Sequence, residues 1–205
     1  MTHILNVTSS PRGDASYSNR VRARALDDIR RYRRDAAVVV HDFARDALHH
    51  LDEDFFTATH ATGKALTAGQ RAALERPSAL IDELLAADAV VTAAAMINSG
   101  IPSILKAWID HICRAGRTFS YGEGGAKGFV SGKQVTVVVA RGGIYSNANK
   151  TVDFQLPYLR NMLALLGMTE VVEVEGTAFG PEVADKSVVA AFRQLNEPCT
   201  QAVAA

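Results

Sequence analysis

This sequence has few cysteines, no net charge and no long apolar run, and each of these absences argues against a class of protein. The 205 residues include only Cys113 and Cys199, which form no CxxC or Cys/His spacing, so neither a disulfide framework nor a zinc site is indicated. The formal charge is zero, which gives no long-range attraction to nucleic acid or to an anionic membrane. We therefore expect a small-molecule ligand and no metal, nucleic-acid or membrane partner.

No apolar run reaches the roughly 18 residues that span a bilayer, and the first residues lack the basic and apolar regions of an export signal. We therefore expect a cytoplasmic protein. The length suits one α/β domain with a full core, so residues 1–205 are predicted to form a single domain. Because His49, His50 and His60 match no common metal spacing, we predict a surface position for them.

Short apolar or β-branched runs alternate with amphipathic helical patterns along the chain. The predicted strands are His3–Val7, Ala37–His41, Ala89–Ala94, Gln134–Ala140 and Glu170–Val174. The predicted helices are Ser18–Arg34, Gly69–Ala86, Ile104–Ile112, Asp153–Leu166 and Lys186–Gln201. This alternation predicts a parallel doubly wound sheet between two layers of helices.

Five strands favour a flavodoxin-like α/β three-layer sandwich with strand order 2-1-3-4-5 over a six-stranded dinucleotide fold. Three segments fall outside the alternation, and loops of this length in a compact domain are more often functional than structural. These predicted loops are Phe43–Leu66, Phe119–Gly132 and Gly142–Lys150.

The segment Thr8–Asn19 joins the first strand to the first helix and is rich in hydroxyl groups. In an open parallel sheet, ligands bind beyond the carboxyl ends of the strands, where a helix N-terminus offers free N–H groups to a phosphate. The hydroxyls of Ser10, Ser16 and Ser18 would add neutral donors; the alternative is that Ser16 or Ser18 caps the helix. Because neither G-x-G-x-x-G nor G-x-x-x-x-G-K-[ST] is present, we expect a phosphate monoester.

Two further turns follow the third and fourth strands. Asn98–Gly100 breaks the third strand before Pro102 and would present backbone amides on which a planar ring can rest, with a plain βα turn as the alternative. Gly142 and Gly143 follow the fourth strand and would let the backbone aim N–H groups at negative charge on a bound ligand. Three loops at three strand ends predict one ligand site.

With these loops, the chain resembles the FMN-dependent NADH-azoreductases within the flavodoxin-like quinone reductases. The resemblance runs from end to end. Its matching pieces are Ser9-Ser10, Ser16–Asn19, Met96–Asn98, Leu105-Lys106 through Asp110, Arg114–Tyr121, Gly128, Gly132-Lys133, Arg141–Ile144 and Gly180–Glu182.

The resemblance implies FMN as the cofactor, with no covalent catalytic side chain. The residues implied to bind FMN are Ser10, Ser16, Tyr17 and Ser18 at the phosphate and ribityl chain, Met96, Ile97, Asn98 and Ser99 at the ring and ribityl chain, and Ala140, Arg141, Gly142 and Gly143 on the pyrimidine side. Family members often carry P-M-Y-N-F where this chain has Ala95–Ser99, and histidine where it has Tyr145. The substrate pocket is therefore expected to differ from that of relatives.

Phe119, Tyr121 and Tyr145 are the predicted substrate-pocket residues. The first two would stack on a bound ring or cover a partner subunit, and core packing is their open alternative. The implied activity is ping-pong transfer of two electrons from NADH or NADPH, through FMN, to a quinone or azo compound in a homodimer. The alternatives are a flavodoxin-type electron carrier, which the balanced charge disfavours, and a flavin-binding regulatory protein.

Overall fold

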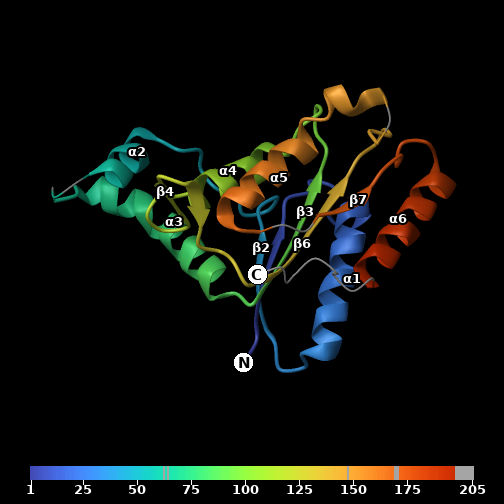
Figure 1. The fold of residues 1–205 in the computed structure, drawn as a ribbon, viewed down its shortest axis with the longest axis horizontal. Coiled ribbons are helices and arrows are strands. Elements are labelled where there is room, and N and C mark those ends of the chain that lie inside the picture. Colours follow the sequence, from blue (N-terminus) through green and yellow to red (C-terminus); the bar gives the residue numbers. More distant parts are fainter. Residues whose placement is uncertain (62, 64, 147, 169–170, 197–205) are drawn as a thin grey trace.

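The structure is a computed structural model that describes residues 1–61, 63, 65–146, 148–168 and 171–196. Its centre is a five-stranded parallel sheet in the order β2-β1-β3-β6-β7 (Figure 1). The strands of this sheet are β1 His3–Thr8, β2 Ala37–Asp42, β3 Ala89–Ala95, β6 Gln134–Ala140 and β7 Val171–Val174. The predicted parallel sheet is confirmed, although Glu170, the predicted start of its last strand, lies outside the described residues.

The predicted labelling 2-1-3-4-5 is not matched, because two additional strands intervene along the chain. β4 (Phe119–Gly122) and β5 (Gly125–Gly128) pair as an antiparallel hairpin outside the main sheet. This hairpin occupies much of the segment predicted as the loop Phe119–Gly132. Its glycines gave no strand signal, since glycine is depleted in strands and has no side chain to pack.

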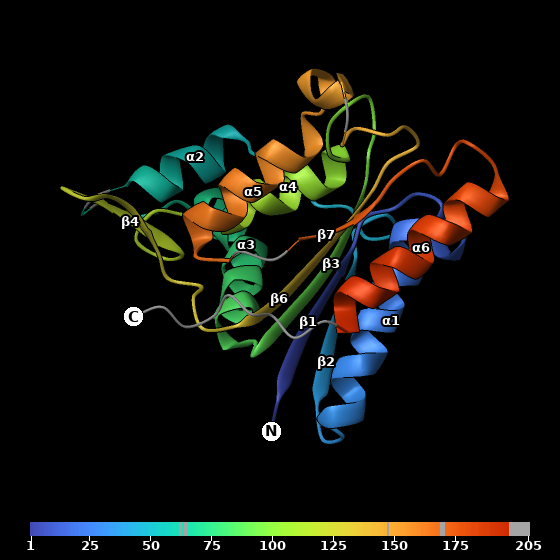
Figure 2. The same cartoon turned by 45° about the vertical axis from the view of Figure 1, so that its right-hand side comes forward.

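Helices cover both faces of the sheet, with α1 and α6 on one face and α3, α4 and α5 on the other (Figures 1 and 2). The helices are α1 Tyr17–Tyr32, α2 Glu53–His60, α3 Ala68–Ala86, α4 Ser103–Ile112, α5 Gln155–Leu166 and α6 Pro181–Asn196, with short 3-10 turns at η1 Gly13–Ala15 and η2 Ala148–Val152. The predicted α1, α3, α4 and α5 are confirmed with small shifts at their ends.

Two helices differ from the sequence-based expectation. α2 lies within the predicted loop Phe43–Leu66, where Asp52 caps it by accepting a hydrogen bond from the amide of Phe55 at 2.7 Å. Its eight residues are too few for a clear periodic pattern. α6 begins at Pro181 rather than Lys186, because proline suits the first position of a helix. The predicted end of this helix, Gln201, lies outside the described residues.

The larger core cluster lies between the sheet and the α3–α5 layer, where Val90 and Val137 pack with Ile81 and Trp108. Smaller clusters, including Val21 of α1, fill the opposite face. Strands β3 and β6 are almost wholly buried, as their apolar residues at both parities predict.

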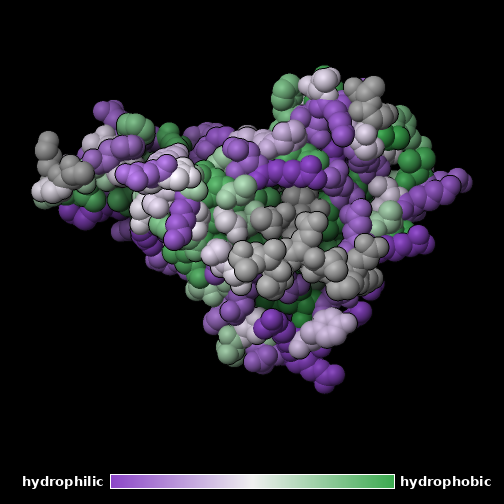
Figure 3. All heavy atoms as spheres, in the orientation of Figure 1, coloured by the Kyte–Doolittle hydropathy of each residue, from purple (hydrophilic) through white to green (hydrophobic). Residues whose placement is uncertain are grey.

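The face seen in Figure 3 is largely polar, with hydrophobic side chains gathered at its upper right, near the upper end of α6. His49, His50 and His60 are exposed, as predicted. Across the described ranges, no helix combines the length and the apolar character needed to cross a membrane.

Candidate functional site

The three predicted loops meet at one edge of the sheet. β1 pairs with β3 and β3 with β6, all parallel, so their carboxyl ends lie side by side. The hydroxyl of Ser9 donates to the carbonyl of Ala93 at 3.0 Å, and the amide of Met96 donates to the carbonyl of Ala140 at 2.8 Å. These bonds tie the loops to the neighbouring strands, so the loops gather at the edge where ligands bind in open parallel sheets.

The loop after β1 leads into a helix end that no side chain caps. Ser16 stands at the N-cap position of α1, but its hydroxyl accepts no hydrogen bond from the first-turn amides. It lies instead 3.0 Å from the hydroxyl of Ser18, and both serines are buried, as is Ser10. The capping alternative is therefore wrong. Neutral hydroxyls and free amides at the positive end of a helix dipole are a donor set that suits a phosphate.

A buried asparagine holds this loop closed. Asn19 accepts a hydrogen bond from the hydroxyl of Thr8 and donates one to the carbonyl of Gly13, both at 2.9 Å. Gly13 has a φ of 51°, which glycine adopts without steric penalty. Tyr17 is partly buried and packs against the core cluster beneath α6. Its predicted contact with a ligand stays a prediction.

The turn after β3 reverses the chain in two residues, and both lie in the left-handed region. Ile97 and Gly100 exchange backbone hydrogen bonds at 3.0 and 2.9 Å. Between them, Asn98 and Ser99 have φ values of 47° and 64°. Serine rarely adopts this conformation, and residues held there cluster at ligand sites. The predicted contact of this turn with a planar ring stays a prediction.

Replacing Ser99 with glycine is expected to raise the free energy of unfolding by about 0.5–1 kcal/mol, because glycine removes the left-handed penalty but makes the unfolded chain more flexible. Urea denaturation of the two proteins measures the change. Asn98→Gly should raise the free energy of unfolding by less, since asparagine tolerates the left-handed region. A loss of stability in Ser99→Gly would mean that the serine side chain, not the backbone, fixes the turn.

In the loop after β6, the glycine pair Gly142-Gly143 has hydrogen-bonded carbonyls, and its amides differ from them. The carbonyls of Gly142 and Gly143 accept from the amides of Ala178 and Gly176 at 3.1 and 2.9 Å. Neither of the two amides has a hydrogen-bond partner among the described residues. A Cβ added to Gly143 would lie 3.0 Å from the ring of Tyr145. The free amides are suitable donors for negative charge on a bound ring.

Arg141 lies in the same loop, but its side chain turns inward. It is 1 % exposed and forms ion pairs with Asp153 at 2.7 Å, Glu175 at 3.2 Å, and Glu173. Its guanidinium carbon also lies 5.9 Å from the ring centre of Tyr145. The backbone of Arg141 is also bonded, because its amide donates to the carbonyl of Val174 at 2.9 Å and its carbonyl accepts from the amide of Thr177 at 3.2 Å. Arg141 therefore holds the loop in place, and its predicted contact with a ligand stays a prediction.

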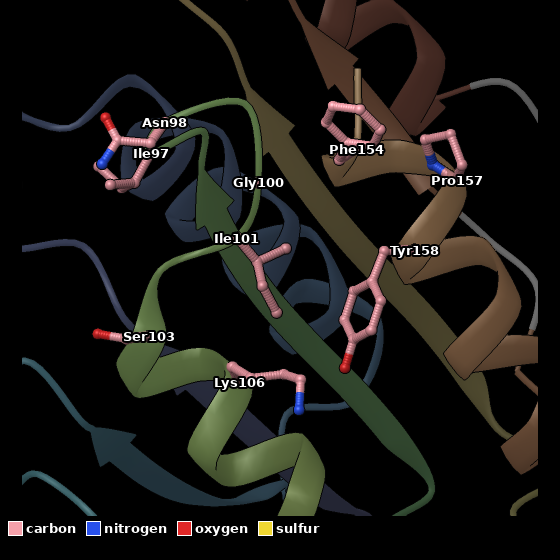
Figure 4. Close-up of a pocket in the computed structure, with 9 residues that line it drawn as sticks. All are labelled: Ile97, Asn98, Gly100, Ile101, Ser103, Lys106, Phe154, Pro157 and Tyr158. Carbon is pink, nitrogen blue, oxygen red and sulfur yellow. The ribbon is translucent and has the colours of Figure 1, made fainter. Parts of the chain in front are cut away.

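A groove opens beside the turn after β3, between the starts of α4 and α5 (Figure 4). Its volume is ≈ 670 Å³. The residues that line it are Ile97, Asn98, Gly100, Ile101, Ser103, Lys106, Phe154, Pro157 and Tyr158. Phe154 lies at one end of the groove, and the polar ends of Lys106 and Tyr158 lie at the other. Largely apolar walls with a few polar groups suit a flat organic molecule.

The polar end of the groove carries little net charge. Lys106 binds both carboxylate oxygens of Asp110, at 2.5 and 2.7 Å. Burial, together with the nearby Asp110 carboxylate, raises the pKa of Tyr158 to about 12. The Tyr158 phenol therefore stays protonated at neutral pH and can donate a hydrogen bond.

The α5 side of the groove is absent from the sequence-based predictions. Phe154, Pro157 and Tyr158 fall in a predicted helix, whose apolar stripe suggests core packing. The available signal was Phe154 itself, an aromatic residue close behind the predicted loop Gly142–Lys150. Its side chain is 64 % exposed.

None of the three predicted substrate-pocket residues lines the groove. Phe119 is buried in the core, with its ring edge-on to that of Tyr121 and the ring centres 5.3 Å apart. Tyr121 is 74 % exposed on the hairpin, which packs against the end of α5 and lies away from the loops after β3 and β6 (Figures 1 and 2). Tyr145 lies beside Gly143 at the site. A pocket role for these residues stays a prediction.

Cys113, at the end of α4, is expected to be nearly inert. Burial raises the pKa of its thiol from 9.0 to about 12. The folded protein should therefore react with iodoacetamide at pH 7 about a thousandfold more slowly than the urea-unfolded chain, because only the thiolate reacts. Because the folded pKa is raised, the thiol's contribution to stability is present below pH 9 and is lost as the pH rises to about 12.

Mass spectrometry of a Cys199→Ser variant, alkylated before and after unfolding, measures the reactivity of Cys113 alone. Equal rates in the folded and unfolded states would contradict the burial of this thiol.

Known proteins resemble this chain over nearly its whole length. Residues 2–198 match the family model described as flavodoxin-like fold. The FMN-dependent NADH:quinone oxidoreductase of Mesorhizobium japonicum is 41% identical over 196 residues, which cover 94% of this chain and 93% of that protein. The chain belongs to this flavodoxin-like family. A relative of the same description from Ralstonia nicotianae is 40% identical, covering 98% of this chain and 99% of its own.

Solved structures also resemble this chain over nearly its whole length. An azoreductase from Bacillus anthracis str. Sterne matches with a TM-score of 0.86 at 28% identity, covering 95% of this chain and 97% of that one. An FMN-dependent NADH-azoreductase from Bacillus anthracis str. Ames Ancestor, solved in complex with FMN, matches with a TM-score of 0.82 at 26% identity, covering 96% and 98%. The family predicted from the sequence motifs is therefore confirmed.

Proposed function

We propose that this protein is an FMN-dependent oxidoreductase that transfers two electrons from NADH or NADPH to quinones and azo compounds by a ping-pong mechanism. The observation that carries this proposal is the meeting of three donor-bearing loops at the carboxyl ends of β1, β3 and β6. The relatives described as FMN-dependent NADH:quinone oxidoreductases and azoreductases support the choice of cofactor and substrates.

Each loop would hold one part of the cofactor. The amides at the start of α1 and the hydroxyls of Ser10, Ser16 and Ser18 would bind the phosphate, and the turn Met96–Ser99 would contact the ring. In the loop Ala140–Gly143, the amides of Gly142 and Gly143 would donate to the pyrimidine edge. When bound, FMN would supply the redox chemistry by accepting a hydride from the nicotinamide and passing two electrons to the acceptor.

The groove between α4 and α5 would receive the donor and the acceptor in turn. A ping-pong mechanism needs one apolar site beside the ring that two flat molecules occupy one after the other. Ile97, Ile101 and Phe154 would contact the faces of such molecules, while the neutral phenol of Tyr158 would donate to a carbonyl oxygen. By holding the substrate in a reactive orientation against the ring, these walls would lower the entropic part of the activation barrier.

We also propose that the protein is a cytoplasmic homodimer. Tyr121, Phe129 and Phe154 are 74 %, 41 % and 64 % exposed, and a second copy would cover such aromatic surface. Sedimentation equilibrium should give twice the chain mass of 22.0 kDa; a species of single-chain mass would contradict the dimer.

An absorption spectrum of the purified protein, followed by anaerobic addition of NADH, tests the function. We expect a yellow protein that NADH bleaches, and parallel double-reciprocal plots with a soluble quinone. A protein that stays colourless and cannot be reconstituted with FMN would exclude the proposal. A flavin that binds but is not reduced by NADH would indicate an electron carrier instead.

A further inference from the structure

The residues at the start of α5 each hold a different part of the proposed flavin site. They are consecutive in sequence, and two of them, Asp153 and Gln155, are 6 % and 0 % exposed. The carboxylate of Asp153 accepts a hydrogen bond from Arg141, after β6, at 2.7 Å. The backbone amide of Phe154 donates to the carbonyl of Ser99, after β3, at 2.9 Å. The side-chain amide of Gln155 donates to the carbonyl of Ala94, within β3, at 3.1 Å.

Asp153 joins α5 to the loop after β6 through its two carboxylate oxygens. Oδ1 accepts hydrogen bonds from the backbone amides of Gln155 and Leu156, at 2.9 and 3.1 Å, and so satisfies the first turn of the helix. Oδ2 accepts from the Arg141 guanidinium. Any shift of the helix start would therefore be transmitted to the residue that precedes Gly142 and Gly143.

Phe154 and Gln155 join the same helix start to the other loop. The Phe154 amide holds the carbonyl of Ser99, one of the two strained residues of the turn after β3. Gln155 reaches the end of β3 itself through Ala94. The start of α5 is thus bonded to both loops that carry predicted ring contacts.

These contacts exceed what is needed to dock a helix. α5 already packs Leu156, Leu159 and Leu163 into the core. Among the described residues, the Oε1 atom of Gln155 and the Nε atom of Arg141 are buried without hydrogen-bond partners, which lowers stability relative to an apolar helix start. Buried polar groups of this kind are best explained by the geometry that they fix.

We propose that residues 153–155 form a positioning hub, which fixes the turn after β3 and the loop after β6 relative to each other so that both meet one planar ring. The inference rests on the proposed function for the identity of that ring. The coupling between the two loops rests on the contacts of this chain alone, so the two ideas can fail separately.

Two variants cut the hub at different bonds. In Asp153→Asn, the side-chain oxygen still accepts from the first amides of α5, but its NH₂ group meets Arg141, which cannot accept a hydrogen bond. Gln155→Met removes the donor to Ala94 with no change of charge. Glu173→Gln is the matched control, because it removes a negative charge from the same guanidinium and touches none of the hub residues.

Amide hydrogen exchange on the FMN-free protein is the first measurement. In peptides covering residues 96–100 and 141–145, the hydrogen-bonded amides of both hub variants should exchange about fivefold or more faster than those of the wild type, because both loops lose a shared anchor. These reporting amides are Ile97, Gly100, Arg141 and Tyr145. Glu173→Gln should match the wild type in both peptides. If Asp153→Asn does not fold, as shown by circular dichroism, Gln155→Met decides the outcome.

Stopped-flow bleaching of the flavin by NADH, expressed per bound FMN, is the second measurement. Misplaced loops should lower this rate about ten- to a hundredfold in the hub variants, and less than about twofold in the control. Variants that melt earlier but keep wild-type exchange and bleaching rates would overturn the hub, because the helix start would then serve stability alone. If the wild type binds no FMN, the proposed function fails, and hydrogen exchange still decides the hub.

Discussion

Ser16→Asp is expected to weaken FMN binding about a thousandfold without lowering the melting temperature of the FMN-free protein. Aspartate is a favoured N-cap residue and interacts well with the helix dipole, so α1 should be as stable as before or more so. The new carboxylate would, however, face the phosphate. Two like charges about 4 Å apart repel by roughly 4 kcal/mol at an effective dielectric constant of 20, which corresponds to about three orders of magnitude in affinity.

Quenching of FMN fluorescence measures the affinity, and circular dichroism measures the melting temperature. Thr67→Asp is the matched control, because Thr67 caps α3 by accepting from the amide of Gln70 at 3.2 Å and lies on a different helix from the phosphate loop. It adds the same charge at a helix start and should change FMN affinity less than about twofold. Unaltered binding by Ser16→Asp would place the phosphate elsewhere.

Gly128→Ala is expected to destabilise the protein by about 3 kcal/mol or more. A Cβ at this position would lie 2.2 Å from the carbonyl carbon of Leu166 and 2.4 Å from the amide nitrogen of Gly167. Both are backbone atoms at the end of α5, and they cannot rotate away as a flexible side chain would. The hairpin and the helix must therefore separate. Urea denaturation at pH 7 measures the loss.

The same hairpin offers a control. A methyl group added to Gly124 would meet no atom of the described residues within 4 Å, so Gly124→Ala should change the free energy of unfolding by less than about 0.5 kcal/mol. Equal losses in the two variants would mean that alanine disturbs the hairpin itself rather than its contact with α5.

The parallel sheet could be predicted because its central strands leave few alternatives. The segment Ala89–Ala94 is apolar on both of its faces, which only two covering layers of helices can bury. The hairpin could not be predicted in the same way. The position of the hairpin depends on the contact between Gly128 and Leu166, which are far apart in the sequence. No local sequence pattern at either residue predicts this contact.

The candidate site also has a part that the sequence could predict and a part that it could not. Ser16 and Ser18 lie where the connection after β1 enters α1, and the glycine pair Gly142-Gly143 lies just after β6. Their positions after strands are enough to predict that these residues gather at the carboxyl edge of the sheet. The inward turn of Arg141 depends on carboxylates supplied by other segments, so spacing along the sequence does not reveal it. These charges meet there only after folding.

The position of β6 between β3 and β7 has a consequence for biosynthesis. β3 can pair with β1 early, but roughly 40 residues must follow before β6 is made, which takes about 2 to 8 seconds at 5–20 residues per second. During this interval one edge of the apolar strand β3 has no partner within its own chain. Such an edge is a template for pairing between nascent chains on neighbouring ribosomes. Yield of soluble protein should therefore depend on translation speed and chaperone supply more than on the stability of the finished fold.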